Sequence, residues 1–352
     1  MSFMPKPSAH HPALPKNAQG LTRRDYEGTM STLCAGCGHD SITAALIEAC
    51  FELDLPPHRI AKVSGIGCSS KAPTYFLSRA HGFNSVHGRM PSVTTGAALA
   101  NRDLVYIGVS GDGDTASIGL GQFCHAVRRR LNMTYIVMNN GCYGLTKGQF
   151  SATNDKASPS KKGEPNPFDA IDLCQLAIQL GAGFVARSFS GDKAQLIPLI
   201  KAAINYNGFA LLDVVSPCVT FNNHPASTKS YDYVRSHNMA SEKQLDYVEP
   251  KEEITVEYGE GTSADIELHD GSRLILNKLG ARHDPRDADA ALMTIRASAA
   301  KGAVTTGLLY IDQSQHDMHD ILATDARPLN AVPVSELCPG SRALEAINAR
   351  LQ

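Results

Sequence analysis

Short apolar runs alternate with segments of helical periodicity along most of the chain. Apolar residues run together, as in buried strands, at 59–64, 103–110, 133–138, 184–187 and 210–215. Between these runs, apolar residues recur with helical spacing at 41–53, 116–130, 170–180 and 193–205. Strands that alternate with helices in this way are typical of a mostly parallel sheet with helices on both faces. The pattern therefore predicts an α/β fold.

The pattern changes at both ends of this region. Residues 1–29 are rich in Pro, His and small polar residues, which is typical of an extended arm lying on another surface. Residues 219–262 are polar and aromatic, and we expect an ordered crossing segment there, followed by one helix at 287–299 and one strand at 306–311. We therefore divide the chain into an N-terminal arm (1–29), a main binding domain (30–225) and a C-terminal extension (226–352).

Length and composition limit the classes of protein to consider. The 352 residues exceed one ordinary domain of ~100–200 residues, and an apolar content of 43% is enough for a sizeable core. Because 33 Lys and Arg balance 35 Asp and Glu, the charge gives no indication of binding to nucleic acid or to an anionic membrane. No apolar run approaches the ~18–20 residues of a membrane span, and the first residues do not resemble a signal peptide. We expect a cytoplasmic protein.

Polar residues follow two neighbouring strands of the predicted sheet. Gly111-Asp112-Gly113 comes directly after the strand at 103–110, and Asn139-Asn140 comes after the next strand, with 25 residues between the two motifs. Asp112 and Asn140 should then lie side by side at the carboxyl edge, where open α/β sheets bind ligands. A carboxylate, an amide oxygen and the carbonyl of Cys142 suit Mg²⁺, while the glycines and the helix expected from about Ala116 suit a diphosphate. Gly-Asp-Gly alone is more often a simple turn, but its pairing with Asn-Asn resembles the thiamine-diphosphate binding motif.

The nine cysteines give a second signal. Their odd number, without a secretory signal, argues against a disulfide framework. Cys34 and Cys37 form a CxxC motif, and Cys68 and Cys218 each follow a predicted strand. Four such thiolates suit a structural zinc or an iron–sulfur cluster, and CxxC alone also suits a redox dithiol. A [4Fe–4S] cluster is favoured because it could accept single electrons from a thiamine cofactor bound beside it, whereas zinc could not. We interpret the remaining partnerless cysteines as buried structural thiols: Cys50, Cys124, Cys174 and Cys338.

Five ordered sequence blocks resemble the β subunit of 2-oxoacid:ferredoxin oxidoreductases. The blocks are CAGCGH, GIGCSS, HGRMPSVTTGAALA, GDGDTASIG and NNGCYGLTKGQFSAT, within about residues 25–225. The 2-oxoglutarate branch is the most similar, and the extension resembles that of longer bacterial β subunits of this type. Ala35 departs from the Pro that is common in the family, which should change the stiffness of the loop but not ligation.

The resemblance implies roles for particular residues. It implies that the [4Fe–4S] cluster ligands are Cys34, Cys37, Cys68 and Cys218. It also implies that the Mg²⁺ ligands are Asp112, Asn140 and the carbonyl of Cys142. The residues implied to line the thiamine cofactor are Ile66, Gly67, Cys68, Ser69, His87, Gly113, Asp114, Gly144 and Leu145. His87 also has an alternative interpretation, as a polar turn residue.

The resemblance also implies a reaction. This is the oxidative decarboxylation of 2-oxoglutarate with coenzyme A to succinyl-CoA and CO₂, with reduction of ferredoxin, or the reverse carboxylation. A pyruvate or branched-chain 2-oxoacid enzyme is the alternative, and a non-catalytic iron–sulfur or zinc scaffold is a remote one. Thiamine enzymes need a carboxylate near the pyrimidine, normally on a second domain, and only the diphosphate-binding half is recognisable in this sequence. The sequence also has no CxxCxxC run for a built-in ferredoxin domain. We therefore expect a partner α subunit that supplies the pyrimidine-binding half, in an α2β2 assembly.

Two lysines are candidates for substrate choice. Lys71 lies three residues after Cys68, and Lys147 lies five residues after Cys142. Burying the distal carboxylate of 2-oxoglutarate requires a positive partner, which either ammonium group could supply. Either lysine could instead extend into solvent or bind a neighbouring chain.

Overall fold

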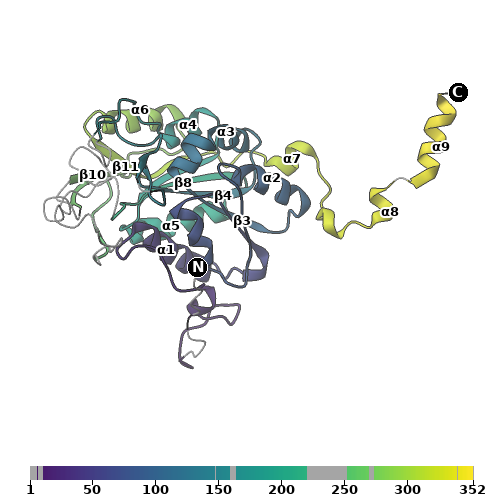
Figure 1. Cartoon of the computed structure of the whole chain (residues 1–352), viewed down its shortest axis with the longest axis horizontal. Coiled ribbons are helices and arrows are strands. Elements are labelled where there is room, and N and C mark those ends of the chain that lie inside the picture. The colour runs from purple at the N-terminus through teal and green to yellow at the C-terminus, as the bar shows by residue number, and fades with distance from the viewer. Residues whose placement is uncertain are drawn as a thin grey trace.

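A computed structural model describes residues 6, 11–146, 148–158, 164–219, 252–268, 273–338 and 340–351. The described part contains a nine-stranded sheet in the order β2-β1-β3-β4-β8-β7-β11-β10-β9 (Figure 1). The strands are β1 (Ile60–Ser64), β2 (His81–Asn84), β3 (Val105–Gly111), β4 (Met133–Asn139), β7 (Phe184–Phe189), β8 (Phe209–Val215), β9 (Ser263–Glu267), β10 (Arg273–Lys278) and β11 (Ala303–Ile311). From β2 to β7 every neighbouring pair is parallel, which confirms the predicted α/β class.

Helices cover both faces of the sheet. On one face lie α1 (Gly38–Glu52) and α5 (Lys193–Asn205), and on the other lie α2 (Met90–Ala100), α3 (Leu120–Arg128), α4 (Leu173–Gln179) and α6 (Ala288–Ala299). Alternate residues of β4 enter the two cores, with Tyr135 and Val137 on one face and Ile136 and Met138 on the other. Because both faces are covered, the central strands are continuous apolar runs.

The expected strands and helices are all present, with one correction. The helix expected at 116–130 is preceded by a π-helical turn, η4 (Asp114–Ile118), and α3 itself begins at Leu120. The sequence did not predict β2, α2, β9, β10 or a short hairpin of β5 (Cys142–Tyr143) and β6 (Gln149–Phe150). Most of the crossing segment expected at 219–262, namely residues 220–251, lies outside the described residues.

Segments that precede and follow the central domain pack on it. In the N-terminal segment, Tyr26 is fully buried in a short helix, η1 (Arg23–Tyr26), and its hydroxyl donates to the carbonyl of Leu55 (2.8 Å). In the C-terminal segment, β11 pairs antiparallel with β7, so that β9, β10 and β11 extend the main sheet. A buried ion pair between Lys278 Nζ and Asp192 Oδ2 (2.6 Å) joins β10 to the N-cap of α5. The predicted division at residue 225 therefore separates segments that share one sheet.

The last part of the chain leaves this body. After α7 (Met318–Leu322), the segment that carries α8 (Val334–Leu337) and α9 (Gly340–Arg350) extends away from the sheet, in yellow in Figure 1. Apolar side chains of this segment, including Val334, Leu344 and Leu351, are exposed. Among the described helices, none has the length and apolar character needed to cross a membrane.

Candidate functional site

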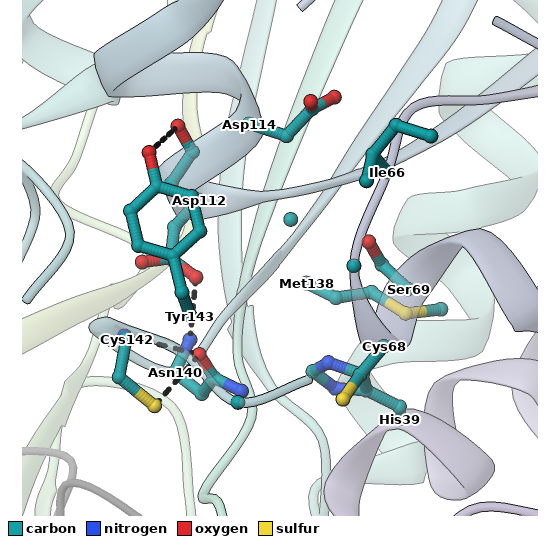
Figure 2. Close-up of a pocket in the computed structure, with 14 residues that line it drawn as sticks. His39, Ile66, Cys68, Ser69, Asp112, Asp114, Met138, Asn140, Cys142 and Tyr143 are labelled. Carbon is teal, nitrogen blue, oxygen red and sulfur yellow. Dashed lines mark hydrogen bonds between the residues drawn. The ribbon is translucent and has the colours of Figure 1, made fainter. Parts of the chain in front are cut away.

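A pocket lies at the carboxyl ends of β1, β3 and β4, the edge where parallel α/β sheets bind ligands. Figure 2 shows Asp112, Asn140 and Cys142 on one side and Cys68, Ser69 and His39 on the other. The lining residues are His39, Ile66, Gly67, Cys68, Ser69, Gly111, Asp112, Gly113, Asp114, Met138, Asn140, Cys142, Tyr143 and Gly144. Most of the residues expected to bind thiamine diphosphate and Mg²⁺ are therefore brought together.

The two expected oxygen ligands are neighbours. Because β3 and β4 pair in parallel, Asp112 and Asn140 follow adjacent strand ends, and the Asn140 N–H donates to Asp112 Oδ1 (3.2 Å). The Cys142 N–H donates to Asn140 Oδ1 (3.2 Å), which folds the 140–142 turn toward Asp112. Both Asp112 and Asn140 are buried. A carboxylate, an amide oxygen and a nearby main-chain carbonyl form a donor set that suits Mg²⁺.

Glycines let the backbone approach the pocket closely. A Cβ on Gly113 would lie 2.6 Å from the Tyr143 ring, and one on Gly65 would overlap the Asp114 carboxylate. Gly67 has φ +105°, a conformation that L side chains rarely adopt. The Ser69 hydroxyl, which lines the pocket, is buried and has no hydrogen-bond partner in the described part of the chain. A crowded glycine cradle with a buried, unsatisfied donor fits a diphosphate group.

A buried lysine fixes the loop that carries Cys68 and Ser69. This loop is η3 (Cys68–Thr74), and the Lys62 ammonium on β1 donates to the carbonyls of Pro73, Phe76 and Leu77 at 2.6–2.8 Å. Three acceptors match the three N–H groups of an ammonium. The loop is therefore held against β1 next to the pocket.

Three lining residues were not predicted. His39, in the first turn of α1, is buried, and its Nδ1 lies 2.6 Å from Ser216 Oγ. Burial lowers the pKa of His39 to about 4, so the imidazole is neutral at pH 7. Tyr143 donates its hydroxyl to the Gly113 carbonyl (2.8 Å), and Met138 comes from β4. His39 belongs to the CAGCGH block, so a signal for it was present in the sequence.

The four candidate cluster cysteines are brought together less completely than the expected Mg²⁺ ligands. A Cβ on Gly144 would lie 3.4 Å from Cys68 Sγ and 3.8 Å from Cys218 Sγ, so both thiols face this glycine. Burial and the neighbouring Cys218 thiol raise the pKa of Cys37 well above its usual value and that of Cys68 to about 11. Cys34 is exposed.

Cysteine thiolates are suitable ligands for an iron–sulfur cluster, but the four of them do not form a closed set in the described part of the chain. The described residues contain no group of three or more His, Cys, Asp and Glu side chains that could hold a metal ion. Ligation of a cluster by Cys34, Cys37, Cys68 and Cys218 therefore stays a prediction.

The remaining predicted residues lie at the margin of the pocket or beyond it. His87 is exposed after β2 and Leu145 is half exposed, and neither belongs to the lining. The next residue, Gly88, donates its N–H to Asp114 (2.8 Å) and so joins the His87 turn to the pocket. Lys71 is partly buried in η3, near enough to Cys68 to oppose the rise in the pKa of that thiol. Lys147 lies outside the described residues.

Comparison with known proteins decides the family. The family described as "Thiamine pyrophosphate enzyme, C-terminal TPP binding domain" matches residues 65–214. The 2-oxoacid:ferredoxin oxidoreductase subunit beta of Saccharolobus solfataricus is 41% identical over 221 residues, which cover 62% of this chain and 72% of the relative. The chain belongs to the β subunits of the 2-oxoacid:ferredoxin oxidoreductases.

Other members of this β-subunit family agree. The 2-oxoacid:ferredoxin oxidoreductase subunit beta of Sulfolobus sp is 44% identical over 191 residues, covering 54% of this chain but only 63% of the relative. The 2-oxoglutarate synthase subunit KorB of Methanocaldococcus jannaschii is 38% identical, covering 53% of this chain and 69% of the relative. The structure of 2-oxoglutarate:ferredoxin oxidoreductase from Magnetococcus marinus, with 2-oxoglutarate, coenzyme A and succinyl-CoA bound, is similar with a TM-score of 0.69. It is 30% identical and covers 86% of this chain and 89% of that chain. These matches confirm the predicted family and its thiamine-diphosphate-binding fold.

Proposed function

We propose that this β subunit carries the thiamine and electron-transfer centre of an enzyme that oxidatively decarboxylates 2-oxoglutarate, or runs the reverse carboxylation. The observation that carries the proposal is the position of Cys68. It lines the pocket that contains Asp112 and Asn140, and its sulfur faces Gly144 together with that of Cys218. A cluster held there would border the thiamine site.

Each residue set has a distinct task in this proposal. Asp112, Asn140 and the Cys142 carbonyl would hold Mg²⁺, and the Ser69 hydroxyl would donate to the diphosphate. Cys34, Cys37, Cys68 and Cys218 would hold a [4Fe–4S] cluster for electron transfer to ferredoxin. When bound, thiamine diphosphate supplies the nucleophilic carbon and the electron sink for decarboxylation of a 2-oxoacid, and coenzyme A accepts the acyl group. The neutral His39, fixed by Ser216, is suited to hold a hydrogen bond at the pocket without adding charge.

The carboxylates of the pocket support the need for an α subunit. In the described lining, these are Asp112 and Asp114. Asp114 accepts from the Gly88 N–H (2.8 Å) and from Ser110 Oγ (2.9 Å), and Asp112 accepts from neighbouring hydroxyls. Both carboxylates already accept hydrogen bonds from other groups of this chain. The carboxylate that thiamine requires at its pyrimidine would therefore come from the α subunit, in an α2β2 assembly.

The 2-oxoglutarate assignment rests on Lys71 and on the relatives. Lys71 is partly buried, close to the pocket-lining Cys68, and could pair with a distal carboxylate. Relatives named 2-oxoglutarate synthase, and the structural neighbour with 2-oxoglutarate bound, support the same substrate. A pyruvate or branched-chain 2-oxoacid enzyme is the second candidate, since other relatives are named only as 2-oxoacid enzymes.

The test is ferredoxin reduction by the anaerobically purified αβ complex with coenzyme A and 2-oxoglutarate, pyruvate, 2-oxobutyrate or 2-oxoisovalerate. We expect the highest kcat/KM with 2-oxoglutarate and no turnover by the β chain alone. A preference for another acid would overturn the substrate assignment, and turnover by β alone would overturn the requirement for α. A colourless, iron-free active complex would remove the cluster from the proposal.

A further inference from the structure

Two buried hydroxyls lie behind the candidate metal ligand Asp112. The Ser151 and Thr153 hydroxyls both donate to Asp112 Oδ2, the latter at 2.8 Å. They belong to the segment after β6, which is fixed to the turn after β4 because the Ser151 N–H and Asn154 Nδ2 donate to the Gly141 carbonyl (3.3 and 3.0 Å). The hydroxyl pair thus sits on a fixed loop rather than on a free surface segment.

The hydroxyls define which carboxylate oxygen is available to a ligand. Oδ2 faces Ser151 and Thr153, whereas Oδ1 faces the Asn140 N–H at the pocket (3.2 Å). A carboxylate without these donors could rotate about χ2, because that torsion is broad for Asp. Oδ1 is therefore directed toward Asn140 by bonds made at the other oxygen.

Thr153 also contacts a network of buried polar groups that crosses the sheet. Asn139 Oδ1, 3.0 Å from Thr153 Oγ1, is a second acceptor that shares the single hydroxyl hydrogen with Asp112. Asn139 Nδ2 donates to Asp213 Oδ1 (3.0 Å). Asp213 also accepts from Arg187 Nε (2.9 Å), and Arg187 Nη2 donates to Asp172 (2.8 Å). Arg187 and Asp213 are buried and are register partners on β7 and β8.

The Arg187–Asp213 pair fixes the amide of Asn139. Because the Asp213 carboxylate accepts from Nδ2, the carbonyl oxygen of the Asn139 amide must face Thr153. Buried networks of this kind are rigid when every member has a partner. Asn139 therefore has a task different from that of Asn140, although the two are adjacent in the sequence.

We propose that Thr153 is a positioning residue whose hydroxyl sets the Asp112 carboxylate for a divalent cation by donating to Oδ2. This inference rests on the Mg²⁺ site of the proposed function. Thr153 is not among the lining residues of the pocket and would act on the cation through Asp112. Residues that orient metal ligands from behind typically change metal affinity by about 10–100-fold when they are removed.

The experiment measures Mn²⁺ binding to the αβ complex in the presence of thiamine diphosphate, from the electron paramagnetic resonance signal of free Mn²⁺. Thr153→Val removes the hydroxyl at nearly constant volume and should raise the Mn²⁺ Kd at least about 10-fold. Thr153→Ser restores the hydroxyl and should return the Kd to within about 3-fold of wild type. Thr94→Val is the matched control, because it removes a buried threonine hydroxyl that only bonds the Met90 carbonyl within α2.

The outcomes separate this inference from the proposed function. Wild-type protein that binds no Mn²⁺ with thiamine diphosphate would overturn the Mg²⁺ site itself. Tight binding by wild type and equally tight binding by Thr153→Val would overturn the positioning role alone. Circular dichroism checks folding, and Thr153→Ala gives the same comparison if the valine methyl does not fit.

Discussion

The oxygen side and the sulfur side of the pocket are built differently. Asp112 and Asn140 follow adjacent strands, are buried and are bonded to each other. The four candidate cluster cysteines come from three separate segments, one of them exposed, and do not close into a metal-holding group among the described residues. The sheet therefore fixes the oxygen donors in advance, whereas we expect the thiolates to take their final arrangement only when a cluster binds.

The largest expected effect is on the oxygen side. Asp112→Ala removes the only carboxylate of the predicted Mg²⁺ set, so the diphosphate would lose the cation that neutralises it. We expect no retained thiamine diphosphate after gel filtration, measured by thiochrome fluorescence. Asp169→Ala, at a largely exposed carboxylate, should retain the cofactor. Stoichiometric cofactor in Asp112→Ala would mean that the Gly-Asp-Gly turn is only structural.

The second prediction concerns the sulfur side. Cys218→Ala should lose most of the iron and the ferredoxin-linked activity while it keeps thiamine diphosphate, because Asp112 and Asn140 are held by their own hydrogen bond and adjacent strands. Cys124→Ala, at a cysteine of α3, should keep iron, cofactor and activity. Iron analysis and thiochrome fluorescence on the same samples make the comparison. Equal iron in the two variants would remove Cys218 from the ligand set, and loss of both cofactors together would remove the contrast between the two sides.

The smallest expected effect is at Lys71, in the loop that carries Cys68. Lys71→Ala should lower kcat/KM for 2-oxoglutarate by roughly 10–100-fold, the effect of losing a charged hydrogen bond of about 1.5–3 kcal/mol. Activity with 2-oxobutyrate should fall much less, and exposed Lys301→Ala should change neither. Steady-state kinetics with both acids decide the question. An equal loss with both acids would indicate that Lys71 supports the Cys68 loop rather than the substrate.

The pattern of apolar residues was sufficient to predict the buried strands of the fold. The strands β3, β4 and β8 are apolar runs covered on both faces, and such runs are easily recognised. The strand β2 is four exposed residues, His81–Asn84, with no alternation to detect. The helix α2 contains Pro, Gly, Ser and Thr, which have weak helix propensity, so tertiary packing decides its structure. The strand β10, RLILNK, alternates in burial but not in polarity, because Leu274, Ile275 and Leu276 are consecutive apolar residues.

The residues of the candidate site likewise divide into those that the sequence predicts and those that it does not. Asp112 and Asn140 were predictable because strand ends of a parallel sheet meet at one edge. Ser151 and Thr153 were not, because no periodicity indicates that a loop about 40 residues away returns to Asp112. The role of Asn139 was not predictable either, since its bond to Asp213 depends on the pairing of β4 with β8.

The outermost strands of the sheet bear on how the subunit can assemble. An exposed outer strand offers unpaired N–H and carbonyl groups to another chain, and proteins limit this with short strands or charged residues. At one end β2 has only four residues, and at the other β9 presents Asp265 and Glu267, with Asp265 paired to Arg273 (2.7 Å). Both ends are therefore poor templates for strand addition. We expect a partner subunit to bind through helices and side chains, without adding a strand to the nine of the described sheet.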